Sequence, residues 1–275
     1  MSRGLGALLL ASVFLIALCG LIYELLLGTL SSYLLGNGIL QFSLTIGLFM
    51  TAMGIGSYLS RFATGNLLPP LLAVELLLGL LGGSSALLLY VAFLHTRVYY
   101  VVFVTLILVL GALIGAEIPL LTRLLRSYTS LRDALARVLS IDYLGALGAA
   151  LLFPLVLLPY LGTMKTALLT GLLNTLVAAS LIWLFRRDLA GGRSLLLGAA
   201  GACLALLLVG LGLAGRLTGW VERSIYKDEV LISRHTPYQH IVLSRWNSEL
   251  RLFLNGNLQF SSADEARYHE ALTQP

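Results

Sequence analysis

The chain has 275 residues, of which 58% are hydrophobic and only 11% are charged, and its formal net charge is +5. A mean hydropathy of +0.91 excludes an ordinary soluble globular protein, because too few polar side chains are present to cover a solvated surface. Positive charge can indicate nucleic-acid binding, but these basic residues lie between apolar segments and are not interleaved with aromatic side chains. We therefore predict a polytopic membrane protein whose partner is the lipid bilayer, with no nucleic-acid partner.

Seven apolar segments are long enough to cross about 30 Å of hydrocarbon, which takes roughly 20 helical residues. The first segment is too long for a cleaved signal peptide. The sequence therefore predicts a mainly α, polytopic membrane helix bundle over residues 1–215, located as a multi-pass protein in the cell (inner) membrane. The predicted spans are 5–30, 40–59, 71–94, 98–121, 141–161, 166–185 and 195–213.

Basic residues are unevenly divided between the two ends of this seven-helix arrangement. Cytoplasmic loops attract Lys and Arg, so the excess predicts a cytoplasmic amino terminus, and an odd number of spans then places residues 216–275 outside. An eighth span within 123–137 would reverse that placement. Four arginines in this stretch would each cost about 2.5–3.5 kcal/mol at a helix centre, so we predict a connecting helix on the membrane surface. One end has Arg3, Arg61, Arg123, Arg126, Arg132, Arg137, Arg186, Arg187 and Arg193, and the other has Arg97 and Lys165.

Three carboxylates, Glu24, Glu75 and Glu117, interrupt the apolar spans. An ionised carboxylate inside a membrane is costly unless it faces a partner or a watery cavity, so all three are functional candidates that could bind a polycation. In the alternative interpretation, Glu24 and Glu117 reach interfacial water or pair with Arg61 and Arg123, and only fix helix packing.

Small residues recur four positions apart in two spans, at Ala52 and Gly56 and at Gly111 and Gly115. This spacing predicts close helix packing. Cys19 and Cys203 both lie in apolar segments and lack the spacing of metal ligands, so we predict no metal site.

Residues 216–275 form a separate, more polar domain. Alternating apolar residues predict strands at 239–243 and 250–254, joined by a turn at 245–249. Asn255-Gly256 predicts a tight turn into a third strand at 258–260. Residues 262–265 have the spacing of a capping box, which predicts a short helix over 264–272. The expected fold is a small β-hairpin or three-stranded domain with a short C-terminal helix.

Five short motifs in this domain carry a resemblance. Their order and spacing resemble the amino-terminal β-domain of the polyamine aminopropyltransferases, the spermidine synthase family. Three motifs of the bundle resemble the membrane half of membrane-fused members. The β-domain motifs are Pro237-Tyr238-Gln239, Leu254-Asn255-Gly256, Gln259, Asp264-Glu265 and Tyr268-His269-Glu270, and those of the bundle are Gly20-Leu21-Ile22-Tyr23-Glu24, Gly54-Ile55-Gly56-Ser57 and Gly115-Ala116-Glu117-Ile118-Pro119.

The resemblance implies transfer of an aminopropyl group to putrescine, giving spermidine, with decarboxylated S-adenosylmethionine as co-substrate and no cofactor. It implies that Gln239 hydrogen-bonds the donor or its thioether product and that Tyr268 and His269 contact the amine. These substrates are made in the cytosol, which conflicts with an extracytoplasmic β-domain.

In that family a doubly wound α/β catalytic domain follows the β-domain. No Gly-rich strand-to-helix turn follows it here, so we expect no catalytic residue in this chain and incomplete catalysis by the chain alone. A separate polypeptide could carry the catalytic domain, or the reading frame is truncated, and the family's β-domain contacts imply a homodimer. The alternative function is a non-catalytic membrane transporter or sensor of polyamines, with Glu24, Glu75 and Glu117 as a cation path.

Overall fold

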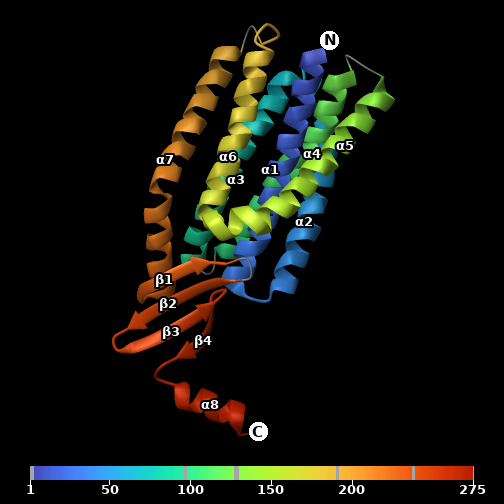
Figure 1. The fold of residues 1–275 in the computed structure, drawn as a ribbon. Helices are drawn as coiled ribbons and strands as arrows, with labels where there is room; N and C mark the ends of the chain where they lie inside the picture. Colours follow the sequence, from blue (N-terminus) through green and yellow to red (C-terminus); the bar gives the residue numbers. More distant parts are fainter. Residues whose placement is uncertain (1–2, 96–97, 127–129, 190–191, 237–238, 275) are drawn as a thin grey trace.

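Seven long helices and a four-stranded antiparallel sheet, followed by a short helix, form the computed structural model, which describes residues 3–95, 98–126, 130–189, 192–236 and 239–274. The helices run up and down in one bundle, with the amino terminus at one end and the sheet at the other (Figure 1). The bundle helices are α1 (Arg3–Leu35), α2 (Gly38–Leu59), α3 (Leu68–Leu94), α4 (Tyr99–Arg126), α5 (Leu131–Leu152), α6 (Leu158–Leu184) and α7 (Arg193–Tyr226). The remaining elements are β1 (Glu229–His235), β2 (His240–Trp246), β3 (Glu249–Leu254), β4 (Asn257–Ser261) and α8 (Glu265–Thr273).

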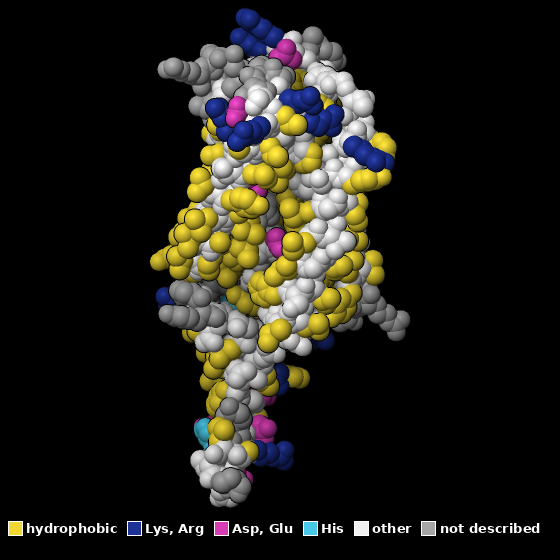
Figure 2. Space-filling view, turned by 90° about the vertical axis from the view of Figure 1, so that its right-hand side faces the viewer, with side chains coloured by type: hydrophobic (Ala, Val, Ile, Leu, Met, Phe, Trp, Pro, Cys, Tyr) yellow, Lys and Arg dark blue, Asp and Glu magenta, His cyan; other side chains and the backbone are white. Residues whose placement is uncertain are grey.

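The bundle is apolar both inside and outside. Large side chains such as Tyr23 and Phe49 are fully buried in its core, while Ile39 is 85% exposed and Leu195 is 78% exposed on its surface. Hydrophobic side chains cover much of the face shown in Figure 2. Six helical stretches within the described residues are long and apolar enough to cross a membrane: Leu8–Leu35, Gly38–Phe62, Leu68–Leu94, Tyr99–Arg126, Leu131–Leu184 and Arg193–Tyr226.

The sequence predicts seven separate spans, and the difference from six arises at one bend. Predicted spans 141–161 and 166–185 both belong to the single stretch Leu131–Leu184, apart from residue 185. A π-helical segment, Phe153–Leu157, joins α5 to α6, and Gly162 has φ 69°, a conformation that favours glycine. Figure 1 shows α5 and α6 running in opposite directions from this bend.

The predicted surface helix over 123–137 is wrong. Its first residues belong to α4, which ends at Arg126, and its later residues belong to α5, which begins at Leu131. Ser130 begins α5 as its N-cap, and its Oγ accepts a hydrogen bond from the Asp133 amide at 3.1 Å. Residues 127–129 lie outside the described residues.

Small residues bring α2 and α4 together, which confirms the predicted close packing. A methyl group on Gly56 would overlap the backbone carbonyl of Ala112, and one on Gly115 would overlap that of Met53. The two backbones therefore touch where glycine stands, since any side chain there would separate the helices.

The sheet has the strand order β1-β2-β3-β4, and every neighbouring pair is antiparallel. The strands predicted at 239–243, 250–254 and 258–260 correspond to β2, β3 and β4. Asn255 and Gly256 have φ of 50° and 79°, so the predicted turn of positive-φ residues is confirmed.

A three-stranded sheet is wrong, because the sequence prediction missed β1. Its residues Val230, Leu231 and Ile232 are consecutive and apolar, and the pairing with β2 is irregular between Val230 and Ile232. This bulge breaks the alternation by which a strand is recognised in sequence.

The helix predicted at 264–272 corresponds to α8, but the predicted capping box is wrong. Ser262 Oγ accepts a hydrogen bond from the Leu250 amide of β3 at 2.9 Å, and Asp264 is the N-cap without a side-chain bond to the helix. Ser262 therefore fastens the chain to the sheet before the helix begins. Figure 1 shows α8 beyond β4, at the end of the molecule away from the bundle.

Candidate functional site

His240 lies at the contact between the sheet and the bundle. It begins β2, its side chain is buried, and its ring stacks on that of Tyr33 near the end of α1, with centroids 6.2 Å apart. Ser233 Oγ of β1 is 3.0 Å from His240 Nε2 and donates a hydrogen bond of 2.5 Å to Glu222 Oε1 of α7. Ser233 Oγ therefore links Glu222 of α7 to His240 of β2.

A cavity of about 600 Å³ opens beside this contact, between the bundle and the sheet. Polar side chains from four elements face it: Tyr90 of α3, Thr163 and Lys165 of α6, Glu222 of α7 and Ser233 of β1. Tyr90 and Thr163 hydroxyls are 2.8 Å apart and hydrogen-bonded. The lining also includes Arg234, so the cavity combines a carboxylate with two basic residues, and its walls are more polar than those of most small-molecule sites.

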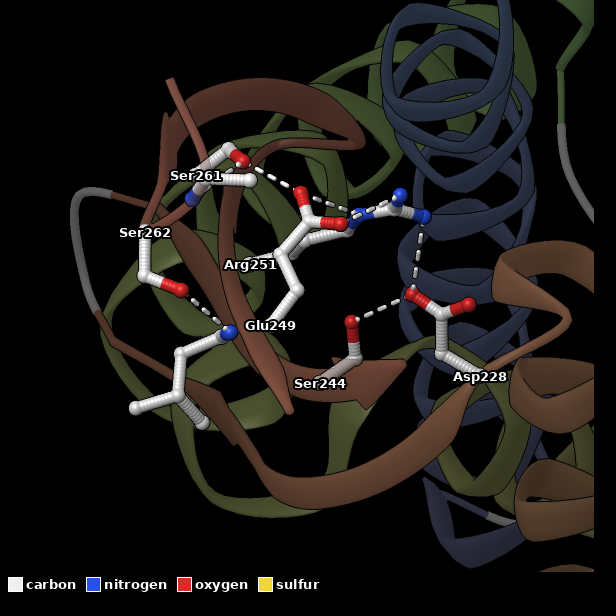
Figure 3. Close-up of polar contacts among 8 residues, drawn as sticks. Asp228, Ser244, Glu249, Arg251, Ser261 and Ser262 are labelled. Carbon is white, nitrogen blue, oxygen red and sulfur yellow. Dashed lines mark hydrogen bonds and ion pairs between the residues drawn. The ribbon is translucent and has the colours of Figure 1, made fainter. Parts of the chain in front are cut away.

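Arg251 organises the polar side of the sheet. It donates two hydrogen bonds of 3.0 Å to the Glu249 carboxylate, and its Nη1 lies 3.5 Å from Asp228 Oδ2 (Figure 3). Hydrogen bonds from Arg251 and Ser261 lower the pKa of Glu249, and the bond to Glu249 raises the pKa of Arg251. Ser244 Oγ donates to Asp228 at 2.9 Å, and Ser261 Oγ donates to Glu249, so this cluster joins the residue before β1 to β2, β3 and β4.

The predicted substrate residues lie at separate places in the β-domain. Gln239 precedes β2 and is half-buried, and its backbone amide and carbonyl both bond to Thr236. His269 is exposed on α8, with Nδ1 3.8 Å from Glu265 Oε1. Tyr268 is also in α8, but its side chain lies outside the described residues. Neither Gln239 nor His269 lines the cavity of about 600 Å³ between the bundle and the sheet, so their roles stay predictions.

The predicted carboxylates of the bundle do come together. Glu75 of α3 and Glu117 of α4 are buried and adjacent, and Asn174 Nδ2 donates to Glu75 Oε2 at 2.9 Å. Glu24 of α1 shares a small cavity with Glu117 and with Asp142 of α5, a carboxylate that the sequence prediction missed.

The alternative pairing with arginines is wrong for the described residues. Arg123 donates to the backbone carbonyls of Ser60 and Ala63, and the Arg61 guanidinium lies 3.8 Å from the centre of the Tyr58 ring. No ion pair links Glu24 or Glu117 to either arginine within the described part of the chain.

The sequence prediction also missed Glu222, Ser233 and His240 as a group. The sequence contains one indication of this group. His240, Val242 and Ser244 occupy alternate positions of β2 and so share one face of the strand, and the structure shows that all three are buried. A buried polar side chain on such a face requires a polar partner, which would have directed attention to this contact.

These features define a class: a helix bundle with carboxyl groups in its interior and a small antiparallel sheet at one end. No protein-family profile matches the chain, and no solved structure is significantly similar to it. The chain is 49% identical over 282 residues to polyamine aminopropyltransferase 2 of Ralstonia nicotianae, an alignment that covers all of this chain and 55% of that protein. It is also 49% identical over 281 residues to polyamine aminopropyltransferase 1 of that organism, covering 53% of it.

Polyamine aminopropyltransferase of Leptospira interrogans is 44% identical over 265 residues, covering 96% of this chain and 53% of that protein. The chain belongs to the polyamine aminopropyltransferase family, as its motifs indicate, and it spans about half the length of these relatives.

Proposed function

We propose that this chain is the membrane-integral bundle and the β-domain of a polyamine aminopropyltransferase. The observation that carries the proposal is its similarity to the named relatives along its whole length. Six stretches of suitable length and the exposed apolar side chains of the bundle support a multi-pass location in the cell membrane. The division at residues 215 and 216 into a bundle and a β-domain belongs to this proposal.

The proposed reaction transfers an aminopropyl group from decarboxylated S-adenosylmethionine to putrescine. An amine nitrogen attacks the carbon next to the sulfonium, the carbon–sulfur bond breaks with its electron pair going to sulfur, and the nitrogen loses a proton. The products are spermidine and a neutral thioether. Such a site must hold both substrates in line and accept that proton.

Gln239 and α8 supply the substrate contacts in this proposal. The Gln239 amide hydrogen-bonds the neutral nucleoside edge of the donor, and Tyr268 and His269 accept hydrogen bonds from the amine. The half of the relatives' length that this chain does not span would supply the donor-binding turn and the proton acceptor. A homodimer and a separate catalytic polypeptide remain predictions.

The experiment measures spermidine formation from putrescine and decarboxylated S-adenosylmethionine by mass spectrometry. A protein spanning the full length of the relatives should turn over, and residues 1–275 alone should not. In the longer protein, Gln239→Ala should lower kcat/KM about tenfold or more and His269→Ala should raise the KM for putrescine, while Gln274→Ala serves as an exposed control. Turnover by residues 1–275 alone contradicts the proposal that the other half of the relatives' length supplies the donor-binding turn and the proton acceptor. No turnover by the longer protein contradicts the proposed function.

Polyamine transport or sensing without catalysis is not favoured. The relatives that match the whole chain carry the names of transferases.

A further inference from the structure

The cavity of about 600 Å³ between the bundle and the sheet lies where apolar segments of the sequence end. Its lining includes Lys165, which directly precedes the apolar segment 166–185, and Gly215, which follows the segment 195–213. The helices that carry these residues, α6 and α7, both contact β1, and Figure 1 shows α7 reaching the sheet at this end of the bundle. In the membrane location proposed above, the cavity therefore lies at the level of the lipid head groups.

Positive charge is in excess in this cavity. Lys165 of α6 and Arg234 of β1 line it, and neither side chain forms an ion pair or a hydrogen bond with another residue of the described part of the chain. Glu222 is the one carboxylate among the described lining residues, and it accepts a hydrogen bond from Ser233 and lies 3.8 Å from His240 Nε2. Two cationic side chains are therefore available for an anionic group of a ligand.

The backbone of α6 supplies further hydrogen-bond donors. Gly162 has φ 69° and ψ 179°, outside the helical region, so the helix starts again at Thr163 and continues to Leu184. Amides in the first turn of a helix lack partners within that helix and favour an anion at its start. Thr163 and Lys165 both belong to this first turn and to the cavity lining. A basic side chain and unpaired amides thus come from the same turn.

The wall formed by α7 is open and leads to an apolar surface. Gly215 and Gly219 line the cavity, and a methyl group on either would meet no atom within 4 Å. Tyr160 belongs to the same lining and is 80% exposed, and Leu213, which precedes the cavity on α7, is 40% exposed. Tyrosine is enriched at membrane–water interfaces, where its ring contacts both head groups and chains. A ligand with an anionic head and apolar chains matches both parts of this site.

From this combination we infer that the cavity binds the phosphate group of an anionic membrane phospholipid. Lys165, Arg234 and the amides after Gly162 bind the phosphate, and the acyl chains lie against the apolar outer surface of α6 and α7. Because Lys165 belongs to the bundle and Arg234 to the sheet, the lipid also joins the two. The inference rests on the membrane location in the proposed function and not on the transfer reaction.

The test uses residues 1–275 in micelles of an uncharged detergent, without an aminopropyl donor. Dioctanoyl phosphatidylglycerol, a short-chain anionic lipid, is titrated into the protein, and its affinity is measured by isothermal titration calorimetry with micelles alone as reference. Lys165→Gln and Arg234→Gln should each weaken binding roughly tenfold or more, because each removes a charge-assisted hydrogen bond. Arg267→Gln on α8, where the arginine side chain is 88% exposed, is the matched control and should bind as the parent does.

A second pair of variants tests the place of binding without changing charge. Gly219→Leu puts a large side chain into the cavity and should weaken binding at least as much as the charge variants do. Gly201→Leu, elsewhere on α7 and also with no atom within 4 Å of an added methyl group, should bind as the parent does. Both variants replace glycine by leucine within one helix, so their difference does not arise from helix propensity.

Saturable binding that is weakened in the three cavity variants and kept in both controls supports the site. No saturable binding to the parent chain overturns it, and so does binding that Lys165→Gln, Arg234→Gln and Gly219→Leu leave unchanged. Glycerophosphoglycerol, the same head group without acyl chains, should bind roughly tenfold or more weakly, because it buries no apolar surface. Equal affinity would make the ligand a soluble phosphate ester and overturns the assignment to a lipid.

The inference and the proposed function fail separately. A longer protein that binds the lipid but transfers no aminopropyl group contradicts the proposed function alone. One that transfers the group but does not bind the lipid contradicts this inference alone.

Discussion

The imidazole of His240 stacks on the phenol ring of Tyr33, with ring planes 29° apart, and so joins the first residue of β2 to the end of α1. Ser233 of β1 lies between His240 and Glu222 of α7 and is within hydrogen-bond distance of both, so this end of the sheet also contacts α7. The sheet is therefore held against two helices that are far apart in sequence. This gives the β-domain a fixed orientation on the bundle, which a small sheet alone would not have.

The turn between β3 and β4 also lies close against α1. Gly256 has φ 79°, and a methyl group there would overlap the Tyr33 carbonyl. We expect Gly256→Ala to lower the thermal unfolding temperature and to expose the segment after Tyr226 to protease. Gly65→Ala is the matched control, because Gly65 has φ 76° and no atoms lie within 4 Å of its added methyl group.

Left-handed strain alone costs about 1–2 kcal/mol per residue, and both variants share it. The difference in unfolding temperature between Gly256→Ala and Gly65→Ala therefore measures the cost of the overlap with Tyr33. Equal unfolding temperatures and equal cleavage in the two variants would show that the turn does not press on α1.

A second prediction concerns helix packing. Gly115→Ala should destabilise the bundle, because its methyl group would overlap the Met53 carbonyl of α2. Gly47→Ala, within α2 and with open space around it, should be neutral or stabilising by up to about 1 kcal/mol, since alanine favours a helix over glycine. Thermal unfolding in the same detergent compares them, and a Gly115→Ala protein as stable as the Gly47→Ala protein would contradict the close approach.

The third prediction is a pH dependence. Since the folded pKa of Glu249 lies below the ordinary carboxyl value near 4.5, its contribution to stability is present above that value and is lost as the pH falls through the folded pKa. Glu249→Gln should therefore cost stability at pH 7 and lose less on acidification than the parent chain.

Protease resistance of the sheet between pH 7 and pH 3 provides the measurement. Glu229→Gln removes a carboxylate that is paired with Arg245 but 63% exposed, and serves as control. The idea fails if the acid sensitivity of Glu249→Gln equals that of the parent.

Some of these features can be predicted from the sequence, and others cannot for physical reasons. The Asn255-Gly256 turn and the glycines of α2 and α4 were predicted, because local backbone conformation and side-chain size suffice for them. The grouping of Glu222, Ser233 and His240 required knowing that α7 continues to Tyr226 and that β1 follows it. Asp142 was missed because its partners Glu24 and Glu117 come from other helices, and only the folded bundle brings them together.

The fourth prediction concerns the two ends of the bundle, which Figure 1 shows far apart. Ser194 lies in the first turn of α7, at the end with the amino terminus, and Ser248 lies in the turn between β2 and β3; both are exposed. We expect cysteines at these positions to lie on opposite sides of the membrane. In a chain with Cys19 and Cys203 replaced by alanine, a membrane-impermeant maleimide added to intact spheroplasts should label one of them, and both after lysis.

The labelled residue also shows which side of the membrane the sheet faces. The distribution of basic residues predicts the outside, whereas proposed substrates made in the cytosol predict the inside. The nine arginines at the amino-terminal end favour a cytoplasmic Ser194, although α7 extends far enough to add Arg216, Arg223 and Lys227 to the sheet end. This remaining excess predicts that Ser248 is the residue labelled in intact spheroplasts. Labelling of Ser194 instead would put the sheet in the cytoplasm beside its proposed substrates, and labelling of both before lysis would contradict the arrangement of the bundle across the membrane.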